Sequence, residues 1–244
     1  MLKKYEVSYF KCNNCGFIQT EKPFWLDEAY SSAIGSEDTG IMQRNLYLRQ
    51  VSSALIGAFF NKHKTFVDFA GGYGIFTRLM RDSGFNYLWH DPFASNLIAR
   101  GFEYSEAVKD VELISAFEAF EHFDNPLEEV DKMLKISKNI LLSTRIVPNP
   151  VPKPDDWWYY SFTGGQHIAL YTIKSFEIIA AKHKLNFYSN GKSVHLLTEK
   201  KINASLFKLV VKTASLAPNK IFTLNLPSKT QSDMIAVLEN KSII

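Results

Sequence analysis

The sequence predicts an α/β protein with a mainly parallel central sheet. From residue 65 onward, short apolar segments alternate with helical stretches, which is typical of strand-helix-strand units. A glycine-rich turn follows the first apolar segment, and an aspartate ends the second. The chain has 244 residues, 46% of them hydrophobic and 22% charged, which suits one globular domain with appendages.

The expected elements follow one another in a regular order. Apolar residues recur at helical spacing over 42–60 and predict a helix there. By the same reasoning we expect strands at 65–69, 87–90, 111–117, 139–144, 187–188 and 194–198, and helices at 75–82, 126–136, 172–185, 204–214 and 232–238. The third strand should lie within 103–109. The last two strands are expected to pair antiparallel around Asn190 and Gly191.

Charge and composition exclude several classes of protein. Lys and Arg total 28 against 25 Asp and Glu, a net charge of +3 without a basic cluster, which argues against a nucleic-acid substrate. The most apolar uncharged run, 50–61, is well short of the ~20 residues that a membrane span needs. No apolar run follows Lys3, Lys4 and Glu6, so we expect no signal peptide. These features favour a cytoplasmic protein that acts on a small molecule.

The strongest chemical motif is the turn at 68–74, which reads Asp-Phe-Ala-Gly-Gly-Tyr-Gly between a strand and a helix. Glycines there let the backbone approach a ligand, and the helix that follows offers unpaired N–H groups. Thr77 stands where a dinucleotide-binding fingerprint needs its third glycine. An ordinary tight turn is the alternative, but Asp91, at the end of the next strand, is placed to bind a ribose diol.

A second segment, 117–126, reads Phe-Glu-Ala-Phe-Glu-His-Phe-Asp-Asn-Pro and matches an E-x-x-E-H-x-x-x-P pattern. With the glycine turn and Asp91, it makes the region 42–200 resemble the class I S-adenosylmethionine-dependent methyltransferases. The resemblance implies a Rossmann-like, mostly parallel sheet of seven strands with helices on both faces. It divides the chain into an N-terminal extension (1–40), a cofactor-binding domain (41–200) and a C-terminal helical tail (201–244).

The same resemblance implies the cofactor site. Asp68 would lie near the methionine part of S-adenosylmethionine, and the carboxylate of Asp91 would accept hydrogen bonds from the ribose. Ala70 departs from the family pattern, which usually has glycine there. The expected cofactor-binding residues are Asp68, Ala70, Gly71, Gly72, Gly74, Asp91, Phe117 and Glu118. For His122 we favour a hydrogen-bonded turn residue over a catalytic one. The adenine contact is left open, with Tyr104 and Ser105 as candidates.

The long segment 145–171 is expected to choose the substrate, because loops of this length in compact domains are usually functional. Its Gln166-His167 pair and its Tyr171-Thr172 pair are similar to those of a methyltransferase subgroup that includes nucleotide-sugar C-methyltransferases. The similarity implies that His167 accepts a proton, assisted by Tyr171. A histidine that bonds loop carbonyls is the alternative.

Aromatic residues near this segment are candidate substrate contacts. Trp158 and Tyr160 would stack on a sugar or base, or would form a hydrophobic lid. Tyr30 in the extension and Gln166 in the loop are further candidates, and simple packing of Tyr30 on the core is the alternative. The expected substrate residues are Tyr30, Trp158, Tyr160 and Gln166.

Cys12 and Cys15 have the spacing of two ligands in a zinc knuckle, which the related subgroup carries in its N-terminal segment. A structural zinc ion needs four ligands, and the sequence has no other cysteine. His63 or a second subunit would have to complete the site, so we favour a metal-free pair.

The sequence therefore predicts methyl transfer from S-adenosylmethionine to a small molecule, with a sugar or sugar nucleotide as the first choice. C-methylation and O-methylation remain open, because both can use a base at His167. A nicotinamide-dependent oxidoreductase shares the strand, the glycine turn and the acid, and is one alternative. A non-catalytic ligand-binding protein with a degenerate methyltransferase fold is the other.

Overall fold

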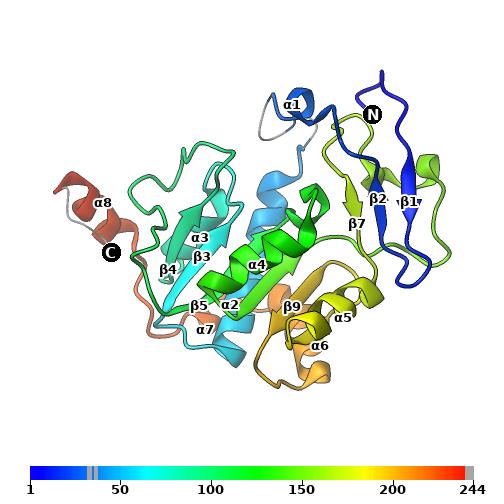
Figure 1. Ribbon diagram of the computed structural model, residues 1–244. Helices are drawn as coiled ribbons and strands as arrows, with labels where there is room; N and C mark the ends of the chain where they lie inside the picture. The colour runs from blue at the N-terminus through cyan, green and yellow to red at the C-terminus, as the bar shows by residue number, and fades with distance from the viewer. Residues whose placement is uncertain (32–34, 36–37, 240–244) are drawn as a thin grey trace.

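The computed structural model describes residues 1–31, 35 and 38–239. Within these residues the main sheet has six strands in the order β4-β3-β5-β6-β9-β8 (Figure 1). They are β3 (Thr65–Phe69), β4 (Asn86–His90), β5 (Val111–Phe117), β6 (Asn139–Ser143), β8 (Asn186–Ser189) and β9 (Val194–Thr198). The first four run parallel, whereas β9 is antiparallel to both β6 and β8. This confirms the predicted mostly parallel α/β fold.

The strand predicted within 103–109, the third in chain order, is reduced to a single bridge. Trp89 pairs in parallel with Glu103, held by the bonds from Trp89 N to Phe102 O (2.8 Å) and from Tyr104 N to Trp89 O (2.7 Å). The residues that follow have no alternating apolar pattern and turn back toward β5. Among the described residues the sheet therefore has six strands where seven were expected, and this bridge marks the place of the missing one.

The helices are α1 (Leu26–Ala29), α2 (Ile41–Phe59), α3 (Ile75–Asp82), α4 (Pro126–Ile136), α5 (Ile173–Lys182), α6 (Ala204–Thr213), α7 (Asn219–Phe222) and α8 (Thr230–Leu238), and the short 3-10 helices are η1 (Phe120–His122), η2 (Pro154–Asp156), η3 (Trp158–Tyr160) and η4 (Ala214–Leu216). Among the described residues, no helix has the length and apolar character of a membrane span.

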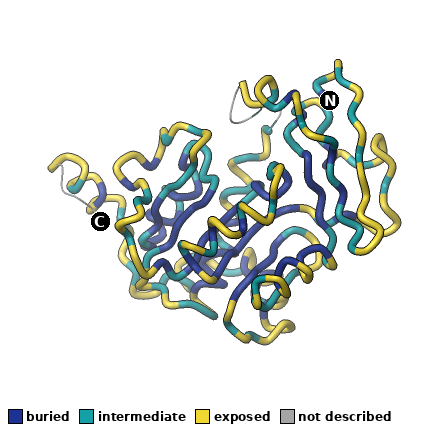
Figure 2. Tube along the Cα trace, in the orientation of Figure 1, coloured by how far each residue is buried: buried dark blue, intermediate teal, exposed yellow. Residues whose placement is uncertain are grey.

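Two hydrophobic clusters hold the helices on the two faces of the sheet. On one face α2, α3 and α6 place Leu55, Met80 and Phe207 against strand residues such as Phe66. On the other face α4 and α5 bury their apolar side chains against the same strands. Each large apolar side chain that is fully buried contributes about 1.5–3 kcal/mol to stability. Figure 2 shows the result, with buried strands at the centre and exposed helix surfaces outside.

The N-terminal segment forms a small sheet that the sequence did not predict. Strands β1 (Tyr9–Lys11) and β2 (Ile18–Thr20) make a hairpin, and β2 also pairs antiparallel with β7 (Ala169–Leu170). The three strands lie side by side at one end of the molecule (Figure 1). Trp25, which is 2% exposed, donates from Nε1 to the carbonyl of Gly165 at 2.7 Å. The extension therefore holds the long loop that precedes β7.

The C-terminal residues also fasten to the core. Helix α6 packs on the sheet itself, and α8 attaches through Asp233, whose carboxylate accepts bonds from Nε and Nη2 of the buried Arg81, both at 2.7 Å. Arg78 adds a further bond to the same carboxylate. The paired guanidinium holds the pKa of Asp233 below its usual value, although burial opposes this. The tail is thus tied to α3 by ion pairs.

Candidate functional site

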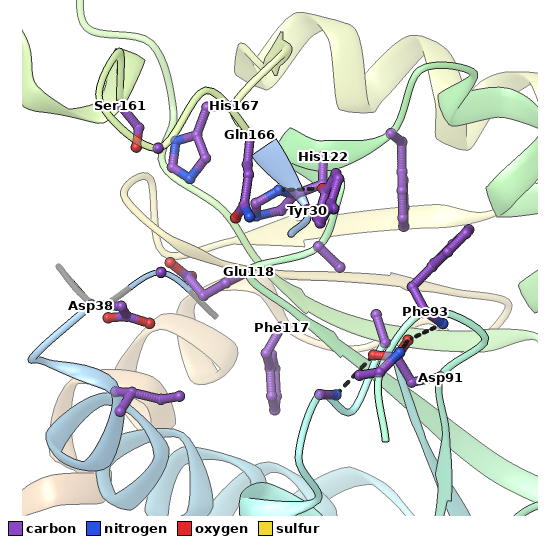
Figure 3. Close-up of a pocket in the computed structure, with 18 of the residues that line it drawn as sticks. Tyr30, Asp38, Asp91, Phe93, Phe117, Glu118, His122, Ser161, Gln166 and His167 are labelled. Carbon is purple, nitrogen blue, oxygen red and sulfur yellow. Dashed lines mark hydrogen bonds between the residues drawn. The ribbon is translucent and has the colours of Figure 1, made fainter. Parts of the chain in front are cut away.

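A cleft of about 1310 Å³ opens at the carboxyl ends of β3, β4 and β5. Its walls come from the glycine turn, the segment after β4, the segment after β5, the start of α2 and the loop 154–167 (Figure 3). Open α/β sheets bind their ligands at this edge, where the connections to the following helices leave a crevice. The cleft is therefore the candidate site.

Close packing explains the glycines of the turn. A Cβ on Gly71 would lie 2.7 Å from Cδ1 of Trp89, and one on Gly74 would lie 2.7 Å from Oδ1 of Asn96. Gly74 has a φ of +86° and begins α3, and it lies behind the turn, away from the cleft wall. Ala70 has a φ of +60°, a left-handed conformation that costs a residue with a side chain about 1 kcal/mol. Although Ala70 replaces the glycine of the family pattern, it thus has the left-handed backbone conformation that a glycine would adopt.

The Asp91 carboxylate is fixed in one orientation. Its Oδ2 accepts from the N–H of Gly72 at 2.9 Å, and its Oδ1 accepts from Phe93 N at 2.8 Å and Ala94 N at 3.0 Å (Figure 3). A carboxylate has about four acceptor sites. Three backbone N–H groups use three of these sites on Asp91. One site on Oδ2 is left to accept a hydrogen bond from a ligand hydroxyl.

Asp68 ties the turn to its surroundings. It is 2% exposed, and its two oxygens accept from Thr77 Oγ1 at 2.8 Å and Ser115 Oγ at 3.2 Å. Burial raises the pKa of Asp68 to about 7, although these two hydrogen bonds act to lower it. The carboxylate connects β3 to α3 and β5, and it also lines the cleft.

Phe117 and Glu118 form the cleft wall at the end of β5. Phe117 packs edge-on against Phe76, with ring centroids 4.8 Å apart. Glu118 has a φ of +49°, and its Oε1 accepts from Ser143 Oγ at 2.6 Å, while Oε2 lies 3.9 Å from Nε of Arg44. The carboxylate of Glu118 thus sits beside a cation at the cleft edge.

Two histidines face each other at the other end of the cleft (Figure 3). The rings of His122 and His167 are 5.1 Å apart and perpendicular. His167 Nδ1 lies 2.6 Å from the carbonyl of Tyr159, so this nitrogen carries the proton and Nε2 keeps a lone pair. His122 Nδ1 lies 3.0 Å from the hydroxyl of Tyr30.

Both histidines are held neutral. Burial lowers the pKa of His167 to about 4. Burial, and then the neighbouring His167, lower the pKa of His122 to about 3, while a bond to the Gln166 backbone opposes this. Neutral imidazole is the form that accepts a proton or binds a metal ion, although the lowered pKa makes each ring a weaker base than a free histidine.

Glu121 is a candidate functional residue that was not predicted from the sequence. It is 0% exposed, and its Oε1 accepts from the hydroxyl of Tyr159 at 2.5 Å, while Oε2 has no hydrogen-bond partner. Burial, and then the charge of Glu118, raise the pKa of Glu121 to about 8. The E-x-x-E-H pattern names this residue, but its burial depends on Tyr159, which comes from a different part of the chain.

A family model described as "Methyltransferase domain" matches residues 42–189, more than half of the chain. The chain belongs to the methyltransferase-domain family. This confirms the methyltransferase family predicted from the glycine turn, Asp91 and the segment 117–126, whereas the likeness to the nucleotide-sugar subgroup stays a prediction.

Similar solved structures include TnmH, an O-methyltransferase family 2 protein from Planctomyces limnophilus in complex with apigenin, and human N-acetylserotonin methyltransferase in complex with SAM. Their identities to this chain are 13%, 13% and 14%, with TM-scores of 0.47, 0.45 and 0.43. The alignments cover 73%, 71% and 72% of this chain, which spans 62%, 66% and 66% of theirs. Similarity at this level says nothing of the substrate. No curated protein matches the chain.

The fold brings most of the predicted substrate residues to one cleft. Tyr30, Trp158 and Gln166 line it together with His167. Trp158 is 71% exposed, and its ring lies 5.7 Å from the guanidinium of Arg145. The amide of Gln166 donates to a backbone carbonyl in α1 at 2.8 Å. These side chains come from two distant segments that meet above the sheet edge.

Two predicted tyrosines lie outside the cleft. Tyr171 is 0% exposed, donates to the carbonyl of Phe120 at 3.0 Å and stacks on Phe176. Its burial raises its pKa well above the ordinary value. Tyr160 donates to the carbonyl of Pro152 at 3.2 Å and packs in a separate cluster. The structure therefore does not place Tyr160 or Tyr171 at the site that the prediction gave them, because both rings are needed for packing. Tyr104 packs on His90, away from the cleft.

The two cysteines lie in the turn between β1 and β2 of the methyltransferase chain. Both are free thiols, and Gly16 N donates to the carbonyl of Cys12 at 2.8 Å. In the part of the chain that the structure describes, neither Cys12 nor Cys15 belongs to a group of three or more possible metal ligands. The expectation of a metal-free pair, with zinc as the less favoured alternative, stays a prediction.

Proposed function

We propose that the protein transfers a methyl group from S-adenosylmethionine to a small-molecule acceptor, with a sugar or sugar nucleotide as the first candidate. One observation carries the proposal: a single cleft joins the carboxylate of Asp91 to the neutral Nε2 of His167. The family match favours methyl transfer over the nicotinamide chemistry considered from the sequence. A cytoplasmic location remains part of this proposal.

The residues at the sheet edge fit the cofactor. Oδ2 of Asp91 has room for one ribose hydroxyl, and the turn at Gly72 brings the backbone to the cleft wall. Phe117 offers an apolar surface, and Glu118 offers negative charge that suits a sulfonium group. S-adenosylmethionine supplies an activated methyl group, and the protein supplies binding and orientation.

The acceptor would bind under the loop, beside the histidines. His167 Nε2 takes the proton from the acceptor as the new bond to the methyl carbon forms and the sulfur–methyl bond breaks. Tyr159 holds the ring through its carbonyl, so that Nε2 points its lone pair away from the backbone. The exposed ring of Trp158 can stack on a sugar face. Both C-methylation and O-methylation are compatible with this arrangement.

The first experiment measures cofactor binding by calorimetry with S-adenosylmethionine and S-adenosylhomocysteine. We expect micromolar binding by the unaltered protein and at least tenfold weaker binding by Asp91→Ala. Asp155→Ala, which removes an exposed acid from the loop side of the same cleft, is the control and should bind normally. Absence of binding to either ligand would reject the proposal.

A further inference from the structure

Three possible metal ligands meet where the cleft reaches the N-terminal segment. The ligand atoms of Glu121, His122 and His167 all lie within 4.8 Å of one another. The first two belong to η1, directly after β5, and His167 comes from the loop before β7, so the fold joins them across 45 residues of chain. Figure 3 shows both histidines at the cleft.

The buried carboxylate points to a missing partner. Glu121 is 0% exposed, and its Oε2 makes no hydrogen bond. Buried polar atoms almost always have a partner, since an unsatisfied one costs about 1–3 kcal/mol. Tyr159 satisfies only Oε1. Oε2 is thus available to a cation, which on binding would displace the proton that the raised pKa of Glu121 keeps on this carboxyl group near pH 7.

The histidines have the surroundings of metal ligands. His167 uses Nδ1 to bind the Tyr159 carbonyl, which fixes its ring and leaves the lone pair of Nε2 free. Histidines that bind metal ions commonly donate their other N–H to a carbonyl in this way. Tyr30 lies 3.0 Å from Nδ1 of His122 and can fix that ring likewise. A metal ion on His122 would replace its bond to the Gln166 backbone.

We propose that Glu121, His122 and His167 bind one divalent transition-metal ion. Ligand atoms around such an ion, each at about 2.1 Å, lie about 3 to 4 Å apart, so the cluster needs only a small side-chain adjustment. Two imidazoles and one carboxylate suit Mn²⁺, Fe²⁺, Co²⁺ or Zn²⁺ better than Mg²⁺, which prefers oxygen ligands. Three protein ligands leave coordination positions open, as in catalytic sites. The two histidines line the cleft, so those positions are accessible to an acceptor.

The consequence for the reaction rests on the proposed methyl transfer. With a metal ion bound, the lone pair of His167 would be used in coordination, and the ion would instead lower the pKa of an acceptor hydroxyl. The hydroxyl proton would leave to water as the oxygen–methyl bond forms and the sulfur–methyl bond breaks. With the ion bound, the site would therefore suit an acceptor hydroxyl, and hence O-methylation, better than a carbon nucleophile.

To test the proposal, the full chain is treated with a chelator and then titrated with a metal ion. The electron paramagnetic resonance of the free ion reports the binding of Mn²⁺, and visible absorption reports the binding of Co²⁺. Neither titration needs cofactor or acceptor, so its failure is separate from that of the proposed function. We expect one saturable site, weakened at least tenfold by Glu121→Gln, His122→Asn or His167→Asn. Circular dichroism melts show whether each variant is folded, and His122→Asn and His167→Asn decide the matter if Glu121→Gln unfolds.

Two controls define the contrary result. Replacing both Cys12 and Cys15 by Ser removes the alternative site, and His63→Asn removes an exposed imidazole. Both controls should bind like the unaltered protein. The proposal is overturned if no saturable binding occurs, if the histidine variants bind normally, or if the cysteine replacement abolishes binding.

Discussion

The two halves of the cleft are built in different ways. The half that would hold the cofactor comes from one continuous stretch, 65–119, in which each strand delivers its residues to the same sheet edge. The half that would hold the acceptor combines Tyr30, η1 and the loop 154–167, joined by contacts between residues far apart in the chain. Local connectivity fixes the first half, whereas long-range packing fixes the second. The two halves should respond differently to substitution.

The largest effect is expected in the first half, at Gly74. A Cβ there meets Asn96 Oδ1 at 2.7 Å in a backbone with φ +86°, so Gly74→Ala should lower the free energy of unfolding by about 2–4 kcal/mol. Gly191 has a similar φ of +78° but nothing within 4 Å, so Gly191→Ala should cost only about 1 kcal/mol. Urea denaturation measures both. Equal losses of stability in the two variants would show that the close contacts around Gly74 do not contribute to the effect.

A pH effect of comparable size is expected in the second half. Because burial lowers the pKa of His167 to about 4 in the folded protein, against 6.5 when unfolded, the unfolded state binds more protons below pH 6.5. Stability should therefore fall as the pH drops from 6.5 to 4, by up to about 2–3 kcal/mol for this group. His167→Gln should flatten that part of the profile, whereas the exposed His63→Gln should not. Denaturation at several pH values tests this, and identical profiles would contradict it.

A smaller effect is expected where the N-terminal segment holds the acceptor loop. Trp25→Phe removes the buried bond from Nε1 to the Gly165 carbonyl and should cost about 1–3 kcal/mol. Amide exchange should quicken over 162–168, while binding of S-adenosylhomocysteine should stay unchanged. Trp158→Phe, at an exposed ring, is the control. A loss of cofactor binding in Trp25→Phe would show that the halves are not separate.

The smallest effect is a gain in stability. Ala70→Gly relieves a positive φ of +60° but makes the unfolded chain more flexible, so the net gain should be under about 1 kcal/mol. Cofactor affinity should stay the same, since the backbone already has the required conformation. Thermal melting measures the change. A clear loss of stability would mean that the methyl group of Ala70 packs favourably.

The difference between local connectivity and long-range packing also explains which features could be predicted from the sequence. Strands such as β3 and β5, the start of α4 at Pro126 and the turn around Gly74 follow from local periodicity and local backbone demands, and they were predicted within a residue or two. The mostly parallel sheet follows from their alternation. The reduced third strand was not predicted, because pairing at Glu103 depends on the neighbouring strand.

The acceptor half was harder to predict because its residues act through distant partners. Nothing local in the sequence shows that Tyr159 bonds to Glu121, or that β2 pairs with the two residues of β7. Tyr171 illustrates the limit: its position after the loop suggested the site, yet tertiary packing buries its ring. Which aromatic residues face a cleft depends on packing that spacing alone does not show.

The central claim is that one cleft binds the cofactor through Asp91 and serves the acceptor through His167. Calorimetry with S-adenosylhomocysteine on the unaltered protein, Asp91→Asn and His167→Asn tests it most directly. The account predicts micromolar binding that Asp91→Asn weakens at least tenfold and His167→Asn leaves intact. Equal binding by all three proteins, or loss of binding only in His167→Asn, would contradict the account.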